Sequence, residues 1–179
     1  YKEYLRTLNM TITISPFDDL GMPRISQLVN KSNQFNLTTR RHNVDSLQQF
    51  QARNDYLCWQ VRLRDTFSDH GMIAVVIVEK RPEFWMVDTW LQSCRVLERG
   101  VEQTLTNSLF ALAKSEGATV IFGQFIPTRK NAMVADLFTR LGFSGSDAPS
   151  PDYVRGSFFR CGVTEYVDLP SEIAVDLSG

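Results

Sequence analysis

The chain has 179 residues, of which 43% are hydrophobic and 22% charged, and its formal net charge is −1. These values are typical of one soluble globular domain, and they give no sign of a surface for nucleic acid or for an anionic membrane. The sequence contains no apolar run long enough to span a membrane and no signal peptide, so we expect a cytoplasmic protein. Three cysteines and two histidines, without a Cys-x-x-Cys motif, predict reduced thiols and no metal site.

Residues 1–9 do not start with a Met and are typical of the end of a connecting segment. We therefore expect 1–179 to be a single domain excised from a longer chain. The acidic composition after Pro170 predicts that 170–179 is a tail that frays.

The first half of the sequence predicts a strand, two helices and a hairpin. Apolar and hydroxyl residues alternate over Met10–Ser15, which indicates a strand. Pro23 opens a helix, and Asn43 or Asp45 caps a second, shorter one. A turn at 65–71 then joins two strands into a hairpin, Tyr56–Leu63 and Met72–Val78.

The second half alternates strands with helices. Phe84–Val87 starts a central strand that leads to Cys94, and apolar residues at helical spacing predict a helix of about five turns from Val96 to the cap Gly117. A buried strand, a helix and a last strand follow at Thr119–Ile126, 131–141 and Ser157–Val167. The predicted order is β-α-α-β-β-β-α-β-α-β, a mixed α/β sheet.

Cys94 lies at the predicted junction between the central strand and the long helix. Helix N-termini have unpaired N–H groups and a partial positive charge, which hold anions and favour a thiolate. Cys94 is therefore a candidate nucleophile, and the N–H groups of Val96 and Leu97 are a candidate oxyanion hole. Arg95 and Arg99 oppose the helix dipole, so they are candidates to bind phosphate, with ion pairs to nearby glutamates as the structural alternative.

Residues 30–41 form a block rich in short amide and hydroxyl side chains. One interpretation is a helix end followed by a solvated loop, because these side chains bond readily to nearby backbone. The other is a polar wall that orients a hydroxylated or phosphorylated ligand, with Arg40 or Arg41 as the anion partner.

Two residues are candidates for a general base. Asp88 is on a buried strand near Cys94, where a carboxylate is costly to bury without a role. His70 is the second candidate, although turn chemistry explains the acids around it. Cys58 and Cys161 fall within strands and are predicted to be core residues.

The element order resembles that of the GNAT N-acetyltransferases. The pyrophosphate loop of that family reads Gln/Arg-x-x-Gly-x-Gly/Ala, and Arg95–Gly100 stands at the same place with Glu98 instead of the first Gly. A Gly there lets phosphate oxygens approach the backbone, whereas a Glu crowds and repels them. Asn131, which is predicted to cap its helix or to face the acyl-carrier arm, belongs to a second matching signature with Ala135, Phe138, Leu141, Gly142 and Phe143. The resemblance implies a GNAT-like acyl-CoA N-acyltransferase fold.

Three longer motifs, at 30–41, 88–100 and 126–131, resemble the C-terminal half of FkbH-like proteins. That family is similar to a fusion of a haloacid-dehalogenase-type phosphatase domain with an acetyltransferase-like domain. Its members take a glyceryl group from bisphosphoglycerate and deliver it as a thioester to an acyl carrier protein in polyketide biosynthesis. The resemblance implies that this chain is the acyltransferase half, with a glyceryl thioester on Cys94. Its implied partners are the carrier protein and an N-terminal phosphatase-like domain of the same polypeptide.

On this interpretation Cys94, Asp88 and His70 are the catalytic residues. The domain itself needs no cofactor, because the phosphopantetheine of the carrier protein is the acceptor. The residues expected to bind substrate or phosphate are Asn33, Asn36, Thr38, Arg40, Arg95, Arg99, Gly100, Thr128, Lys130 and Asn131. Two alternatives stay open: an acetyl-CoA-dependent GNAT N-acetyltransferase, and a non-catalytic docking module for a carrier protein.

Overall fold

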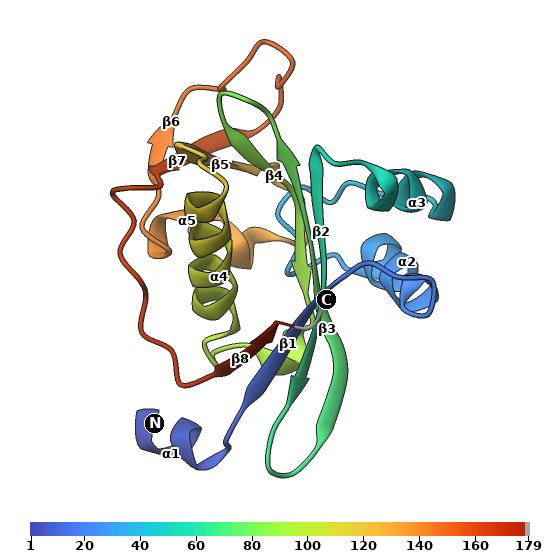
Figure 1. The fold of residues 1–179 in the computed structure, drawn as a ribbon, viewed down its shortest axis with the longest axis vertical. Helices are drawn as coiled ribbons and strands as arrows, with labels where there is room; N and C mark the ends of the chain where they lie inside the picture. Colours follow the sequence, from blue (N-terminus) through green and yellow to red (C-terminus); the bar gives the residue numbers. More distant parts are fainter. Residues whose placement is uncertain (178–179) are drawn as a thin grey trace.

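One mixed β-sheet organises the molecule, as the computed structural model of residues 1–177 shows (Figure 1). The eight described strands follow the order β6-β7-β5-β4-β3-β2-β1-β8 across the sheet. Strands β1 to β4 pair antiparallel, β5 pairs parallel with β4, and β8 pairs parallel with β1. The strands are β1 (Thr11–Pro16), β2 (Tyr56–Arg64), β3 (Asp69–Lys80), β4 (Trp85–Gln92), β5 (Val120–Phe125), β6 (Ser144–Ser146), β7 (Ser157–Gly162) and β8 (Ala174–Leu177). The predicted mixed α/β class is confirmed.

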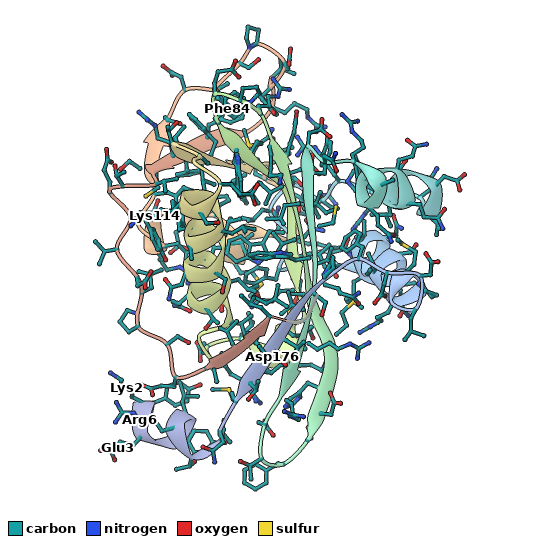
Figure 2. All side chains as sticks on the ribbon, viewed as in Figure 1. Lys2, Glu3, Arg6, Phe84, Lys114 and Asp176 are labelled. Atoms are coloured by element: carbon teal, nitrogen blue, oxygen red, sulfur yellow. The ribbon has the colours of Figure 1, made fainter. Side chains whose placement is uncertain are left out.

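Helices cover both faces of this sheet (Figure 1). On one face α4 and α5 bury a large apolar cluster that includes Leu105, Leu109 and Phe138. On the other face α2 and α3 bury a smaller cluster around Ile25 and Leu47. Figure 2 shows how densely side chains fill the space between α4 and the sheet. The helices are α1 (Lys2–Thr7), α2 (Met22–Lys31), α3 (Val44–Ala52), α4 (Val101–Ser115) and α5 (Leu137–Arg140), with short 3₁₀ helices η1 (Cys94–Val96) and η2 (Ala132–Val134).

The long helix begins later than predicted. The sequence pattern placed its start at Val96, but α4 begins at Val101. The cause lies in the backbone, because Glu98 and Gly100 both have positive φ values, 63° and 94°, which no right-handed helix accommodates. Arg95 and Arg99 therefore lie in η1 and in the following loop, and the prediction that they occupy the first turn of the helix was wrong.

The C-terminal region also differs from the prediction. Part of the expected tail, residues 174–177, is the strand β8, and residues 178–179 of that tail lie outside the described residues. The helix predicted at 131–141 is divided into η2 and α5, and the last long strand ends at Gly162. No helix within residues 1–177 is long and apolar enough to cross a bilayer.

Candidate functional site

The connection from β4 to α4 holds the exposed thiol of Cys94. Ser93 precedes η1, and its Oγ accepts the backbone N–H of Arg95 at 3.3 Å. The Cys94 thiol donates to Oε1 of Gln34 at 3.4 Å. The other two cysteines are buried, as predicted, and burial raises the pKa of the Cys58 thiol to about 12. Cys94 is therefore the one cysteine of the three that is open to a reactant from solution.

The loop after η1 keeps a backbone shape that suits glycine although it carries a glutamate. Glu98 occupies the left-handed region, where a residue other than Gly, Asn or Asp is strained. Gly100, also left-handed, is the N-cap of α4, and a Cβ at this position would stand 3.2 Å from Oγ of Ser171. The loop thus has positive φ values at Glu98 and Gly100, and the side chain of Glu98 brings a negative charge to it.

Arg99 is fixed to the β2–β3 turn through Asp65. Nη1 of Arg99 and Nε2 of His70 both lie against Oδ2 of Asp65, at 3.0 Å and 2.9 Å. The pKa of Asp65 lies far below its usual range. The largest cause is the hydrogen bond with His70, and smaller contributions come from the N–H groups of Ser68 and Phe67 and from Arg99. The turn is shorter than predicted, since β3 already begins at Asp69.

His70 and Cys94 are not hydrogen-bonded to one another. The imidazole contacts Asp65 and Ser68, whereas the thiol contacts Gln34. Arg95 links the two regions, because its Nη2 donates to the backbone oxygen of His70 at 3.5 Å. The role of His70 as a base stays a prediction.

A short segment of the polar block fills the gap where β5 diverges from β4. The two strands pair only over Trp85–Val87 and Ile121–Gly123. Beyond that point Phe35–Thr38 lies between them: Leu37 donates its N–H to the oxygen of Trp90 at 3.2 Å, and Ile126 donates to the oxygen of Leu37 at 2.9 Å. The segment supplies hydrogen bonds that the diverging strands no longer give each other.

Side chains predicted to bind a ligand hold this segment in place. Thr38 and Arg40 both donate to the backbone oxygen of Asp88 at 3.0 Å, and Arg40 also donates to Oε1 of Gln124 at 2.7 Å. Asn36 accepts the N–H of Thr39 at 2.9 Å. Asn33 accepts a hydrogen bond from Arg41. These contacts favour the structural interpretation of the block, although Asn33 is at the exposed edge of the loop.

Asn131 is a second anchor of the segment. Its Nδ2 donates to the backbone oxygens of Asn36 and Ile126 at 3.0 Å and 2.9 Å, and its Oδ1 accepts the N–H of Thr128 at 2.8 Å. Asn131 occupies the N-cap position of η2, as predicted, but its side chain makes no cap bond to that helix. Beside it Lys130 donates its N–H to Oγ1 of Thr128 at 3.2 Å, and its side chain is exposed.

Asp88 forms a cluster with His42, a residue that sequence reasoning missed. Oδ2 of Asp88 lies 3.5 Å from Nε2 of His42 and accepts a hydrogen bond from Thr89 at 2.8 Å. Burial raises the pKa of Asp88, but hydrogen bonds from His42 and Thr89 and the charge of Arg40 outweigh it, and the net shift is downward. The only signal for His42 in the sequence is its position directly after the polar block.

The carboxylate of Asp88 is distant from Cys94. Four residue steps along β4, about 13 Å in an extended chain, lead from Asp88 to Gln92, and Cys94 comes two residues after Gln92. The expectation that Asp88 lies near the thiol was therefore wrong. Gln92 is closer and was also missed: its side chain is 2% exposed, and neither amide atom has a hydrogen-bond partner.

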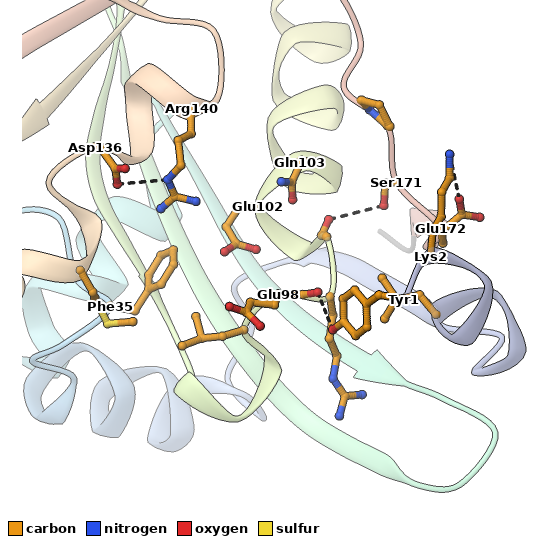
Figure 3. A pocket seen from close by; sticks show the side chains of 16 residues that line it. Tyr1, Lys2, Phe35, Glu98, Glu102, Gln103, Asp136, Arg140, Ser171 and Glu172 are labelled. Atoms are coloured by element: carbon orange, nitrogen blue, oxygen red, sulfur yellow. Dashed lines mark hydrogen bonds and ion pairs between the residues drawn. The ribbon is translucent and has the colours of Figure 1, made fainter.

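A cavity of about 700 Å³ opens over the 97–100 loop (Figure 3). Its walls come from α1, from the N-terminus of α4, from α5 and from residues 170–172. Two predicted phosphate-binding residues, Arg99 and Gly100, line it, but Cys94, Arg95, Thr128, Lys130 and Asn131 do not. The predicted site residues are thus divided between this cavity, the thiol region and the segment between β4 and β5. Within residues 1–177, no three or more His, Cys, Asp or Glu side chains are grouped to hold a metal ion.

The sequence matches no protein-family model and no curated protein. The fold is nevertheless similar to solved acetyltransferases. Ribosomal-protein-S18-alanine N-acetyltransferase from Escherichia coli shares 15% identity, with 86% of this chain and 94% of that chain covered and a TM-score of 0.62. A GNAT-family acetyltransferase from Staphylococcus aureus shares 8% identity, with 86% of this chain and 99% of that chain covered and a TM-score of 0.66. PaiA N-acetyltransferase from Thermoplasma acidophilum was solved with coenzyme A. It shares 12% identity, with 85% of this chain and 99% of that chain covered and a TM-score of 0.65. The chain therefore has the fold of the GNAT acetyltransferases.

Proposed function

We propose that this chain is an acyltransferase that passes an acyl group, most specifically glyceryl, through a thioester on Cys94 to the phosphopantetheine thiol of an acyl carrier protein. It would act as the GNAT-like half of an FkbH-like protein, with the donor supplied by a phosphatase-like domain of the same polypeptide. The observation that carries the proposal is the exposure of Cys94 at the end of β4, while Cys58 and Cys161 are buried.

The chemistry is thiol–thioester exchange, which needs little from the protein. The phosphopantetheine thiolate of the carrier attacks the carbonyl carbon of the Cys94 thioester, and a new C–S bond to the carrier forms. The C–S bond to Cys94 breaks, and the departing Cys94 thiolate takes up the proton that the carrier thiol gave up. The same exchange in reverse loads Cys94 from an acyl-carrier thioester. Cysteine is nucleophilic enough for such an exchange near neutral pH without a dedicated base, so the lack of a His70–Cys94 contact does not prevent it.

Arg95 is the best candidate to stabilise both the thiolate and the oxyanion. The N–H groups of Val96 and Leu97, which we expected to form an oxyanion hole, donate instead to the oxygens of Ser93 and Cys94 inside η1. Nε of the exposed Arg95 guanidinium donates a hydrogen bond to Oγ of Ser93, and its Nη2 donates one to the backbone oxygen of His70. Its remaining N–H donors and its positive charge stay available next to the thiol.

The second candidate is an acetyl-CoA-dependent N-acetyltransferase. The GNAT fold and the left-handed backbone at Glu98 and Gly100 favour it. Against it stand the carboxylate of Glu98 in the pyrophosphate position and the segment Phe35–Thr38, which already pairs with the open edge of β4. Calorimetry with CoA separates the two functions, because micromolar binding would support the acetyltransferase. A non-catalytic docking module is the third possibility, and it predicts a carrier complex that does not depend on Cys94.

Intact-protein mass spectrometry tests the proposed thioester. The chain is mixed with glyceryl-loaded carrier protein, and we expect an acyl adduct that peptide mapping assigns to Cys94. The Cys94→Ala variant should lose the adduct, while the matched Cys161→Ala variant should keep it. Equal acylation of wild type and Cys94→Ala would overturn the proposal.

A further inference from the structure

Two exposed arginines lie at the end of the sheet that extends beyond α2 and α3. Arg62 and Arg64 alternate along β2 with buried residues of the α4 face. They share the opposite face with Cys58, which packs in the cluster under α2 and α3. Figure 1 shows that the β2–β3 hairpin extends well past these two helices. Both arginine side chains are therefore presented to solvent on a flat part of the sheet.

A third exposed arginine, Arg95, lies on the same face. Ser93 continues the β4 ladder, because its N–H donates to the oxygen of Ile73 at 2.7 Å, and it shares a face with Leu91 of the α2 and α3 cluster. Nε of Arg95 donates to Oγ of Ser93 at 3.2 Å, and its Nη2 donates to the backbone oxygen of His70 at 3.5 Å. Since β3 pairs with β2 at this end, Arg95 extends across β3 toward the two arginines of β2.

These three guanidinium groups form no ion pair within residues 1–177. Asp69 stands opposite Arg64 in the ladder, but its Oδ1 accepts the N–H of Gly71 at 2.8 Å, and its charge offsets one arginine at most. The other acid of the hairpin, Asp65, is paired with Arg99. This face thus keeps an excess of positive charge although the chain has a net charge of −1, and it attracts an acidic partner.

An exposed aromatic side chain lies at the tip of the same hairpin. Phe67 is 79% exposed, and its N–H donates to Oδ1 of Asp65 at 2.8 Å, which fixes the turn that presents it. Arginine and aromatic residues are the types enriched where protein–protein interfaces gain their binding energy. Their combination on one hairpin points to a protein as the partner.

We propose that the arginine surface, made of Arg62, Arg64, Arg95 and Phe67, docks a protein whose own surface is acidic. Cys94 directly precedes Arg95, so a partner seated on this surface holds its thiol arm next to the nucleophile. The inference rests on the proposed function, in which the partner is the acyl carrier protein. It adds where that carrier docks and which charge its docking surface has.

Other anions match the arginine surface less well. A protein that binds nucleic acid neutralises many phosphates with a long basic stripe, whereas this surface has three arginines on a chain of net charge −1. A free phosphate would leave Phe67 exposed to water. An acidic protein uses both the charges and the aromatic ring.

Calorimetry with a holo acyl carrier protein that is acidic around its phosphopantetheine serine tests the surface. All variants carry Cys94→Ala, so that no acyl transfer accompanies binding. We expect saturable binding that weakens as salt rises from about 0.05 to about 0.5 M, because the Debye length shortens. Adding Arg62→Glu should weaken binding at least about tenfold, and adding Phe67→Ser should weaken it by a smaller factor. The matched control is Lys114→Glu, which makes the same charge change on α4 over the opposite face (Figure 2) and should bind as its parent.

Four outcomes would overturn the docking surface. These are no carrier binding at millimolar concentration, an equal loss in Lys114→Glu, undiminished binding of Arg62→Glu, and tighter binding of a DNA duplex than of the carrier. Arg64→Gln removes a charge without reversing it, and a smaller loss in this variant would support the surface even if Arg62→Glu folds poorly.

A small donor keeps this inference apart from the proposed function. Glyceryl N-acetylcysteamine thioester has no protein surface, so its acylation of the wild-type chain tests Cys94 alone. If no adduct forms but Arg62→Glu still weakens carrier binding, the acyl transfer is wrong and the docking surface stands. If the adduct forms and Arg62→Glu binds the carrier as the Lys114→Glu control does, the docking surface is wrong and the acyl transfer stands.

Discussion

The backbone N–H of Gln92 donates to the carbonyl of Phe35 at 3.1 Å, which joins the end of β4 to a segment from the α2–α3 connection. This bond and the one from Leu37 to Trp90 close the edge of β4 that β5 leaves open. An acyl-carrier arm that needed to pair with this edge would have to displace the chain's own backbone.

Asn131 should be a large contributor to stability. Replacing it by Ala removes two buried donors and one acceptor, and it leaves the oxygens of Asn36 and Ile126 unsatisfied. We expect the free energy of unfolding in urea to fall by about 2–4 kcal/mol. The neighbouring Lys130→Ala variant, at an exposed position, should stay within about 0.5 kcal/mol of wild type. Similar stability of the two variants would contradict the anchoring role.

Asp65 should link stability to acidic pH. Its pKa is lowered in the folded state, so its contribution is fully present above the unfolded value of about 3.9 and is lost as pH falls through the folded value. At pH 7 we expect Asp65→Asn to be less stable by about 1–2 kcal/mol. Urea titrations between pH 7 and about 2 should show the difference shrinking below pH 4. A difference that stays constant would mean that the hydrogen bond with His70 and the ion pair with Arg99 contribute nothing.

Cys94 should be the thiol that alkylates in the native protein. It is exposed, whereas Cys58 and Cys161 are buried and have raised pKa values. Brief treatment with iodoacetamide followed by peptide mass spectrometry should therefore find one modified cysteine. In urea all three should react. Native modification of Cys58 would show that β2 opens more readily than its packing indicates.

Glu98→Gly should convert the 97–100 loop into a better phosphate cradle. The change removes a negative charge and also the left-handed strain of about 1 kcal/mol at φ 63°. We expect CoA affinity to rise at least about tenfold by calorimetry. Glu98→Ala is the matched control, because it removes the charge but keeps the strain. No gain in either variant would mean that Glu98 does not limit the affinity of the loop for CoA.

Much of the fold could be predicted from the sequence because it depends on periodicity. The alternation in β1 identified a strand, and the apolar stripe of α4 identified a helix. Each pattern also indicated which face of its element is buried. The start of α4 could not be predicted, since the positive φ of Glu98 occurs in a residue that rarely adopts it. The strand β8 was not predicted because its side chains are exposed and its sequence shows no alternation of apolar and polar residues.

The candidate site was predicted only in part, for a related reason. Motif spacing placed Arg99 and Gly100 in the loop that lines the cavity, and it picked out Asn131, which anchors the segment beside β4. It gave no information on the pairing of Phe35–Thr38 with β4, because backbone hydrogen bonds between distant segments leave no pattern in side-chain chemistry.

The parallel pairing of β8 with β1 has a consequence for association. Without β8, the edge of β1 over Thr11–Ile14 that does not pair with β2 would present unpaired N–H and C=O groups, a ready template for another chain. With it, the outermost strand of the sheet is only four residues long. The last described residues thus act as a protective edge, which limits strand-to-strand aggregation of a sheet that is otherwise apolar on both faces.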